Sequence, residues 1–451
     1  MRFLIMLGVL VFNLSANVYD YSALEVNTTQ SNQNQSNKDS KQNGLTLLEL
    51  LEGAKNNYNL EAKDIAILQA KASRFAAFAE FLPTLDGNYS YQNADNTYRK
   101  TISNAAQLKA EWEVFSGLKT TNKLRSQRSL YRASVADREN TKEQLFLNVI
   151  EQYYGYFSNL ALKDALEQKK KQLEVNIARV EKLFRAGLTT IDDVESLRAE
   201  YLTTEHDLAS KLLDIENNKL LLSLLTNLEV ENLERVTIKT PTQEVKDRKD
   251  IIALGEQAKS ALFQARQITY LPTISVSDTF GWNWGLDSTS KPALNDLLGA
   301  GGGAFGGSSF MKMSYPPNQN VIGINVSMRI FDFGNIWKQR QAARYTALQR
   351  EKELAYKKHE QAKDEKLYRK SLEIAQAQIK SSEAALKSAT VSFDNVEKKY
   401  NAQILNFSDF LQSLTRKFEA EAKYKQSIDN YEIQKARYIY YSGQEIEGYI
   451  Q

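Results

Sequence analysis

Apolar and polar residues alternate along four segments of the chain, and this period of two predicts β-strands with one apolar and one polar face. We expect the strands at about 84–92, 105–115, 273–284 and 321–331. Each run has about ten residues, the length of a tilted membrane strand, and Tyr and Trp cluster at ends that would meet lipid headgroups. The residues that we expect to face lipid are Ile324, Val326, Met328 and Trp112. A water-soluble sheet with one wet face remains an alternative explanation of the alternation alone.

Two stretches of roughly 65 residues, 119–184 and 335–400, contain no Pro and a single Gly, Gly155. A helix of that length approaches ~100 Å, which no compact core requires. In the second stretch, apolar residues recur every seven positions beside a companion seam of mostly small residues, as in helices that pack side by side. The apolar positions are Leu372, Ile379, Leu386, Phe393 and Tyr400, and the companion positions are Ala375, Ser382, Ala389 and Val396.

The same series of elements occurs twice along the chain: helix, strand, loop, strand, long helix, turn and helix. Residues 82–85 read LPTL and residues 271–274 read LPTI, at corresponding places in the two series. We therefore expect two repeats, a linker between them and a C-terminal tail, at 45–230, 246–442, 231–245 and 443–451. The turns that follow the two long helices are expected at 185–192 and 401–407.

The N-terminus has the pattern of a signal peptide: Met1 and Arg2, an apolar run over 3–14, then small residues. We expect the signal peptide to end at Ala16, with Ala23 as the alternative end. Residues 27–44 are almost entirely polar and predict a disordered linker. No later apolar run reaches the roughly 18 residues that a membrane helix needs, so a secreted chain of this sequence would enter a membrane only as a β-barrel.

The composition argues against several classes of function. The 58 basic residues are mixed with 55 acidic ones, so no basic stripe for nucleic acid is expected. The chain has no Cys, which excludes disulfides and thiolate sites. Its two histidines, His206 and His359, lie in charged helical stretches, where a solvated side chain is the better interpretation. We expect no catalytic residues, no metal site and no cofactor, and therefore no enzyme.

One segment is specific enough to suggest a family. Residues 184–194 read FRAGLTTIDDV and are followed by LRAEY at 197–201. Together with the order of elements over about 45–442, this resembles the TolC family of outer-membrane efflux and secretion channels. A second segment, YNAQILNFSDFL at 400–411, is similar but lacks the glycine.

The resemblance implies a mainly α fold with a membrane β-barrel. Each chain would contribute long coiled-coil hairpins and four strands, in two internal repeats, to a homotrimer with a 12-stranded barrel and an α-barrel tunnel. Independently of the resemblance, four strands are too few to close a barrel, so oligomerisation is required. The implied location is the outer membrane, with a long periplasmic domain.

The resemblance also implies partners. Besides two further copies of the chain and outer-membrane lipid, these are a periplasmic adaptor (membrane fusion) protein and an inner-membrane pump of the RND, ABC or MFS type. The adaptor is expected to dock on the two tip turns, at Gly187, Leu188, Thr189, Ile404, Leu405 and Asn406.

Candidates for a periplasmic gate follow from the resemblance as well, and they are Asp193, Tyr400, Asp409 and Gln412. The sequence departs from the family at Leu405, where a latch arginine would fall, and at Gln412, where a second ring aspartate would fall. Another explanation of the aspartates remains open. Thr190 and Asn406 are good N-cap residues, and an aspartate three positions later stabilises a helix N-terminus.

The function expected from these features is that of an exit channel in a tripartite efflux pump or a type I secretion system. The chain would act as a passive conduit for drugs, toxic compounds or proteins. The alternative is a secreted coiled-coil protein with a structural or adhesive role, which explains the heptads but leaves the signal peptide and the strand pairs unexplained.

Overall fold

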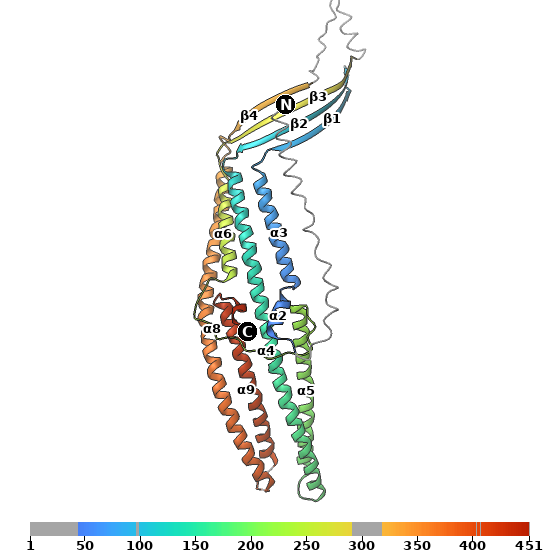
Figure 1. Ribbon diagram of the computed structural model, residues 1–451, viewed down its shortest axis with the longest axis vertical. Coiled ribbons are helices and arrows are strands. Elements are labelled where there is room, and N and C mark those ends of the chain that lie inside the picture. The colour runs from blue at the N-terminus through green and yellow to red at the C-terminus, as the bar shows by residue number, and fades with distance from the viewer. Residues whose placement is uncertain (1–43, 96–98, 291–317, 403, 406, 451) are drawn as a thin grey trace, which may run out of the picture.

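The computed structural model describes residues 44–95, 99–290, 318–402, 404–405 and 407–450. The molecule is elongated, with a sheet at one end and helices that run from the sheet to the opposite end (Figure 1). A mainly helical fold with a few antiparallel strands is confirmed. The expected signal peptide and residues 27–43 of the expected polar linker lie outside the described residues.

The sheet has four antiparallel strands in the order β1-β2-β3-β4. Their bounds are β1 (Thr84–Asp95), β2 (Arg99–Phe115), β3 (Thr273–Ser290) and β4 (Asn318–Ser327). Most of the strands extend further than the sequence predicts, because the pairing continues into residues expected to form loops. Among the described strands, β1 pairs only with β2 and β4 only with β3, so each outer strand keeps one open edge.

The register aligns the alternating residues of neighbouring strands. Trp112 of β2 lies opposite Val276 of β3, which lies opposite Ile324 of β4. Directly opposed residues point to the same face of a sheet, so these three side chains form one apolar row. The adjacent row is polar and consists of Glu113, Ser275 and Asn325.

The sequence placed Met328 inside the last strand, and this was wrong. The β3–β4 ladder ends at the pair Thr273 and Ser327, so Met328 lies one residue beyond β4. The residue before Thr273 is Pro272, which has no N–H to donate to a continuing ladder. The chain then turns through Phe333 and Gly334, both with positive φ, before the next helix begins.

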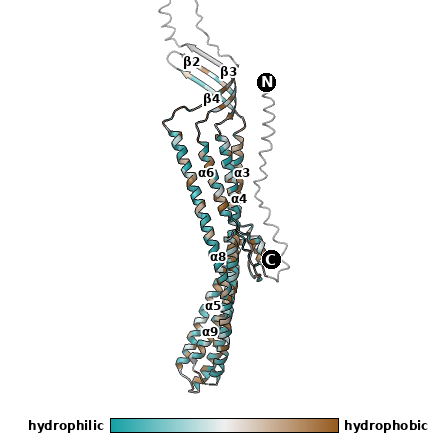
Figure 2. Ribbon diagram, turned by 90° about the vertical axis from the view of Figure 1, so that its left-hand side faces the viewer, coloured by the Kyte–Doolittle hydropathy of each residue, from teal (hydrophilic) through white to brown (hydrophobic). Residues whose placement is uncertain are grey.

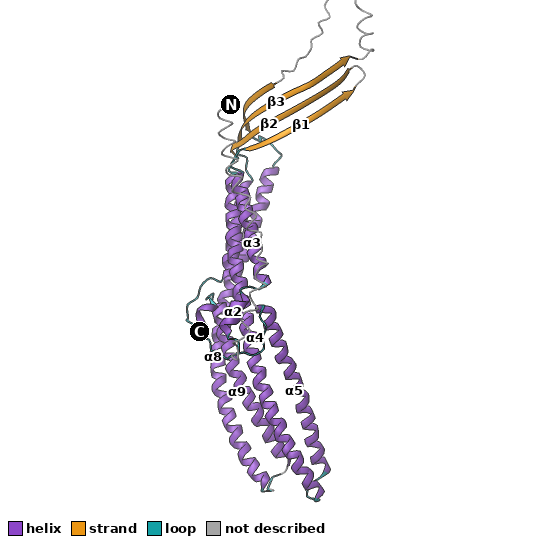
Figure 3. Ribbon diagram, turned by 45° about the vertical axis from the view of Figure 1, so that its right-hand side comes forward, coloured by secondary structure: helices purple, strands orange, loops and turns teal. Residues whose placement is uncertain are grey.

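The helices form the rest of the molecule (Figure 3). Their bounds are α2 (Leu47–Ala54), α3 (Tyr58–Ala79), α4 (Lys119–Arg185), α5 (Ile191–Thr226), α6 (Lys249–Gln267), α8 (Asn335–Asn401) and α9 (Phe407–Tyr441), followed by the 3₁₀ helix η3 (Ile446–Tyr449). The two longest, α4 and α8, have 67 residues each. Hydrophilic residues occur along all of α8, with hydrophobic ones at intervals (Figure 2).

Among the described residues, two helices precede β1, where the sequence predicted one, whereas α6 alone lies between α5 and β3. The break lies at Asn57, whose side chain caps α3 by accepting the N–H of Asn59 at 2.9 Å. The amide of Asn57 also donates to the carbonyl oxygens of Leu224 and Leu225, at 3.3 and 3.0 Å. The cap therefore fixes the start of α3 against the end of α5.

The larger apolar core lies near the middle of the molecule, where α2, α4, α5 and α9 surround the segment between α5 and α6. Its fully buried members include Phe146, Tyr153 and Leu222. The expected C-terminal tail is part of this core, because Ile446 of η3 is fully buried and its N–H donates to Glu143 at 3.0 Å.

Candidate functional site: the helical tip

At the end of the molecule furthest from the sheet, two helical hairpins terminate side by side (Figure 1). In the first, α4 ends at Arg185 and α5 begins at Ile191; in the second, α8 ends at Asn401 and α9 begins at Phe407. These are the two segments that the sequence singled out as tip turns. All the predicted gate residues lie in or next to them.

A second apolar core joins the four helices just above the turns. Each helix contributes at least two buried side chains, and together they are Leu173, Val180, Val194, Leu197, Phe393, Tyr400, Phe410, Leu414 and Phe418. Phe393 and Tyr400 belong to the predicted heptad seam of α8, and Val180 keeps the same spacing in α4. The core is shared by both hairpins, so the position of one tip is coupled to that of the other.

The two turns close with the same backbone hydrogen bond. The N–H of Leu188 donates to the carbonyl of Leu183, and the N–H of Ile404 donates to the carbonyl of Lys399, both at 2.9 Å. This is the six-residue bond of a Schellman motif. In the first turn it is accompanied by Gly187 at φ 75°, a conformation that side chains with a Cβ rarely adopt.

Both turns present an apolar side chain to solvent. Leu188 is 69% exposed and Ile404 is 72% exposed, although each lies three residues beyond the end of a helix with buried apolar residues. Thr189 and Leu405 beside them are partly buried. Asn406, the sixth predicted docking residue, lies outside the described residues.

Tyr400 is the most enclosed of the predicted gate residues. Its ring stacks on Phe410 with 4.6 Å between centroids. On α4, the guanidinium carbon of Arg179 lies 5.1 Å from the centroid of the Tyr400 ring, and Nη1 of Arg179 donates to Oδ1 of Asn401. Burial raises the pKa of Tyr400; the positive charge of Arg179 opposes the shift and the nearby carboxylate of Asp193 adds to it.

Asp193 lies in the first turn of α5 and accepts a hydrogen bond from the hydroxyl of Thr189 at 2.5 Å. The sequence suggested Thr190 as the capping residue. Thr190 does occupy the N-cap position, but its side chain makes no capping hydrogen bond. The preceding threonine holds the carboxylate instead, which fixes Asp193 at the turn and near Tyr400 of the other hairpin.

Asp409 and Gln412 lie in the first two turns of α9 with exposed side chains. Their neighbours Phe410, Ser413 and Leu414 are buried in the tip core. The structure therefore separates the predicted gate residues into two groups. Asp193 and Tyr400 lie between the hairpins, whereas Asp409 and Gln412 are exposed on α9.

Sequence reasoning missed Arg179 and Phe410, the two residues that enclose Tyr400. The heptad spacing identified Val180, but it gave no reason to select the arginine beside it. Phe410 follows directly on Asp409 in the second family-like segment, where the prediction considered the carboxylate alone. An aromatic residue within one turn of a predicted gate residue was the available signal.

Residues 50–228 match the family model described as "Outer membrane efflux protein". The chain is 20% identical over 376 residues to the Outer membrane protein TolC of Escherichia coli (strain K12), covering 80% of this chain and 76% of TolC. The resemblance to the TolC family is confirmed. The relatives that this chain matches are named as outer membrane proteins or channels, in agreement with the predicted localisation.

Solved structures share the TolC-like fold over most of the chain. The CmeC outer membrane channel of Campylobacter jejuni has a TM-score of 0.76 at 18% identity, covering 90% of this chain and 86% of CmeC. CusC, whose structures concern folding and transmembrane channel formation, has a TM-score of 0.74 at 17% identity, covering 88% of this chain and 92% of CusC. These relatives are named as channels or outer membrane proteins, and none is named as an enzyme.

The helices that the structure describes include none with the length and apolar character needed to cross a membrane. Within the same residues, no group of three or more His, Asp or Glu side chains is arranged to hold a metal ion.

Proposed function

We propose that this protein is the outer-membrane exit channel of a tripartite efflux pump or a type I secretion system. The observation that carries the proposal is the combination, in one chain, of a strand sheet with open edges and 67-residue helices that end in paired tips. A conduit that leads from an inner-membrane pump to the exterior needs both parts.

The sheet supports a membrane-spanning role. Ile322, Ile324 and Val326 alternate along β4 and are 71%, 74% and 64% exposed, respectively. Exposing so apolar a face to water costs about 25 cal/mol for each Å² of apolar surface. Contact with lipid removes this cost. We propose that this face contacts outer-membrane lipid and that the polar row beside it lines the lumen.

Assembly as a homotrimer follows from the open edges. Three copies would supply twelve strands, with β1 of one chain beside β4 of the next, which is enough to close a barrel that four strands cannot. The helices offer matching sides: α3 and α5 lie on one side of the chain and α8 on the other (Figures 1 and 3). Exposed apolar residues occur on both sides, among them Ile65, Leu213 and Leu224 on the first and Tyr345 and Tyr356 on the second.

We further propose that the series of elements in 45–230 and 246–442 are two repeats, so that the helices of three chains form a tunnel with pseudo-sixfold symmetry. The equal length of α4 and α8 and the shared backbone bond of the two tips support this. The exposed side chains of Leu188 and Ile404 would then form a ring of six apolar contacts for a periplasmic adaptor. The inner-membrane pump, of the RND, ABC or MFS type, determines which compounds pass.

Fractionation tests the proposal directly. The mature protein is expected to remain with outer membranes after washing with alkaline carbonate and with concentrated salt, and chemical cross-linking should give a trimer. Release of the protein into the carbonate wash would overturn the channel and favour a secreted structural or adhesive protein. Deletion of the gene, tested with a broad panel of toxic compounds and secreted proteins, then identifies the exported class.

A further inference from the structure

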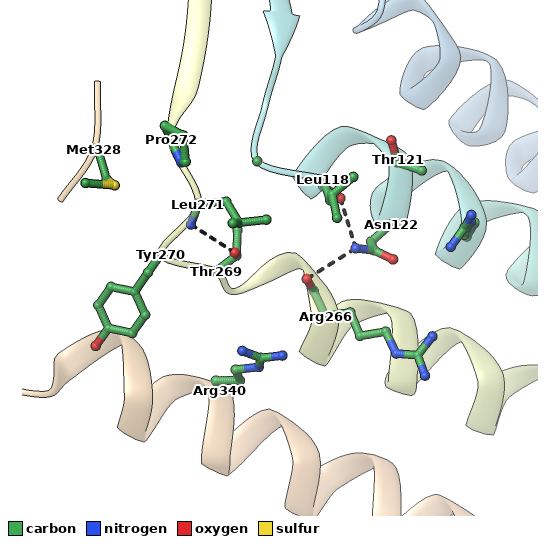
Figure 4. Close-up of a pocket in the computed structure, with 12 residues that line it drawn as sticks. Leu118, Thr121, Asn122, Arg266, Thr269, Tyr270, Leu271, Pro272, Met328 and Arg340 are labelled. Carbon is green, nitrogen blue, oxygen red and sulfur yellow. Dashed lines mark hydrogen bonds between the residues drawn. The ribbon is translucent and has the colours of Figure 1, made fainter. Parts of the chain in front are cut away.

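A cavity of about 690 Å³ lies where the strands meet the helices. The first turns of α4 and α8, the end of α6 and the segments next to β3 and β4 line it (Figure 4). The amide of Asn122 on α4 donates to the carbonyl oxygens of Leu118 and Arg266, at 2.9 and 3.2 Å. This side chain ties α4 to the last turn of α6, so the walls of the cavity are fixed relative to each other.

The lining of this cavity is strongly positive. Three arginines contribute to it, Arg125 of α4, Arg266 of α6 and Arg340 of α8, and no Asp or Glu does. None of the three is within ion-pair distance of a carboxylate in the described part of the chain, although arginines elsewhere, such as Arg138 and Arg198, each have two such partners. Arg340 is partly buried, whereas Arg125 and Arg266 are exposed. A cavity lined by charges of one sign attracts a ligand of the opposite charge.

Arg340 adds an observation that is independent of the net charge. Its Nε is buried and has no hydrogen-bond partner in the structure. In Figure 4 the guanidinium of Arg340 extends from α8 toward the cavity, below Leu271 and Thr269. A buried donor without a partner costs about 1–3 kcal/mol, so an acceptor is expected to occupy this space.

Asp332, which is hydrogen-bonded to the cavity residue Tyr270, already has other partners. Asp332 accepts the N–H groups of Ile336 and Gly334, at 2.8 and 3.0 Å, and the hydroxyl of Tyr270 at 3.1 Å. These backbone hydrogen bonds, the one from Ile336 above all, hold the pKa of Asp332 below its usual value. The carboxylate is thus committed to capping α8.

The N-terminus of α4 strengthens the positive potential. Leu118, its N-cap residue, provides no side-chain capping bond, although Oγ of Ser116 accepts the N–H of Thr120 at 3.1 Å, and the first turn of α4 contains no acidic residue. The helix macrodipole adds partial positive charge at such an end, where it favours an anion.

We propose that this cavity binds a phosphate group. Guanidinium groups pair with phosphate through two parallel hydrogen bonds, and the volume admits a phosphate together with a small polar headgroup. The group can come from a phospholipid or from a soluble phosphate. A lipid headgroup fits the position between the strands and the helices; this part of the inference rests on the proposed function, since it needs the strands to cross the membrane.

The test uses the full-length protein, purified in detergent and stripped of lipid, with two probes: short-chain phosphatidylglycerol and inorganic phosphate. Binding is measured by titration calorimetry for the wild type and for the double variant R266Q/R340Q. We expect the double variant to bind at least about tenfold more weakly, because it loses two charge-assisted contacts. The matched control is R128Q/R344Q, which removes one arginine each from α4 and α8 outside the cavity lining and should bind like the wild type.

The binding results support or overturn the phosphate site as follows. Arginine-dependent binding of phosphatidylglycerol supports the site with a lipid as its source, and arginine-dependent binding of inorganic phosphate alone supports it with a soluble source. Binding of neither probe, or binding that R128Q/R344Q weakens as much as R266Q/R340Q does, overturns the proposal. Carbonate extraction of the same variants reports separately on membrane insertion, so a failed phosphate site is distinguishable from a failed channel.

Discussion

Arg179 of α4 lies over the ring of Tyr400 of α8, with its guanidinium carbon 5.1 Å from the ring centroid, and links the two helical hairpins at their tips. Its second contact, to the side chain of Asn401, lies one residue further along α8. A cation over an aromatic ring and a charged hydrogen bond are together worth about 2–3 kcal/mol in a partly buried site. Arg179 therefore connects α4 to α8 through two contacts of one side chain.

Replacing that arginine should loosen the tip. We expect R179A to raise the conductance of the channel in planar bilayers several-fold, because the two hairpins then separate more easily. Y400F should change conductance little, since the stacking on Phe410 is retained. The matched control is R198A, which removes an exposed arginine of α5 paired with Glu181 and Glu195. Equal conductance of R179A and the wild type would show that the contact does not restrain the tip.

The variant D409N distinguishes two roles for Asp409: a charged ring in the gate, or stabilisation of the start of α9. If three copies meet around the trimer axis, D409N should lower the preference for cations over anions and weaken block by multivalent cations. If Asp409 only stabilises the start of α9, D409N should cost at most about 1 kcal/mol and leave selectivity unchanged. Single-channel recordings decide between the two. D207N, at an exposed position of α5 away from the tip turns, is the control and should keep the wild-type selectivity.

The strands offer a test of which face meets lipid. With no native Cys in the chain, single cysteines at Ile324 and Asn325 report on opposite faces of β4. Water-soluble thiol reagents applied to intact outer membranes should label N325C strongly and I324C weakly. Because Val276 and Trp112 lie in the same row as Ile324, V276C and W112C should follow I324C. Labelling without this alternation would contradict a membrane position for the sheet.

The docking role of the tips predicts a matched pair of defects. L188D and I404D each place a charge where an exposed apolar side chain stands, so both should weaken adaptor binding by about tenfold or more while the trimer stays intact. V175D, on an exposed position of α4 away from the turns, is the control. Pull-down with the purified adaptor measures the effect. Full binding by both tip variants would exclude the turns as the docking surface.

The long helices and the alternating strands were predictable because each rests on a local pattern. The heptad positions Phe393 and Tyr400 are buried, as a sequence period alone suggests. The end of β4 was not predictable from alternation, because the pairing stops at Thr273, directly after Pro272, which precedes the neighbouring strand β3. The same holds for Arg179 and for the arginine cavity. Both depend on contacts between helices that are distant in the sequence. A single sequence does not show which of these helices lie side by side.

Asp429 of α9 gives the last prediction, which concerns stability rather than transport. Its side chain is only 1% exposed, and it accepts a hydrogen bond from Arg235 in the segment between α5 and α6. Burial raises the pKa of Asp429 from 3.8 to about 6; Arg235 opposes this shift and the neighbouring Glu432 adds to it. The folded chain therefore keeps a proton on this carboxyl at a pH where the unfolded chain has lost it. Between about pH 4 and pH 6 the folded state binds more protons, so stability falls as the pH rises.

A shift of about two pKa units corresponds to about 3 kcal/mol, which is the order of the loss expected across this range. D429N cannot ionise, so its stability should lack this decline, and at pH 7.5 it should equal or exceed that of the wild type. D137N, which removes an exposed carboxylate paired with Lys63, should follow the wild-type curve. Urea unfolding of the detergent-solubilised protein, monitored by far-UV circular dichroism from pH 4 to pH 7.5, gives the three curves. If the free energy of unfolding of D429N and of the wild type changes with pH in the same way, Asp429 does not have the raised pKa that burial predicts. That result would contradict the prediction.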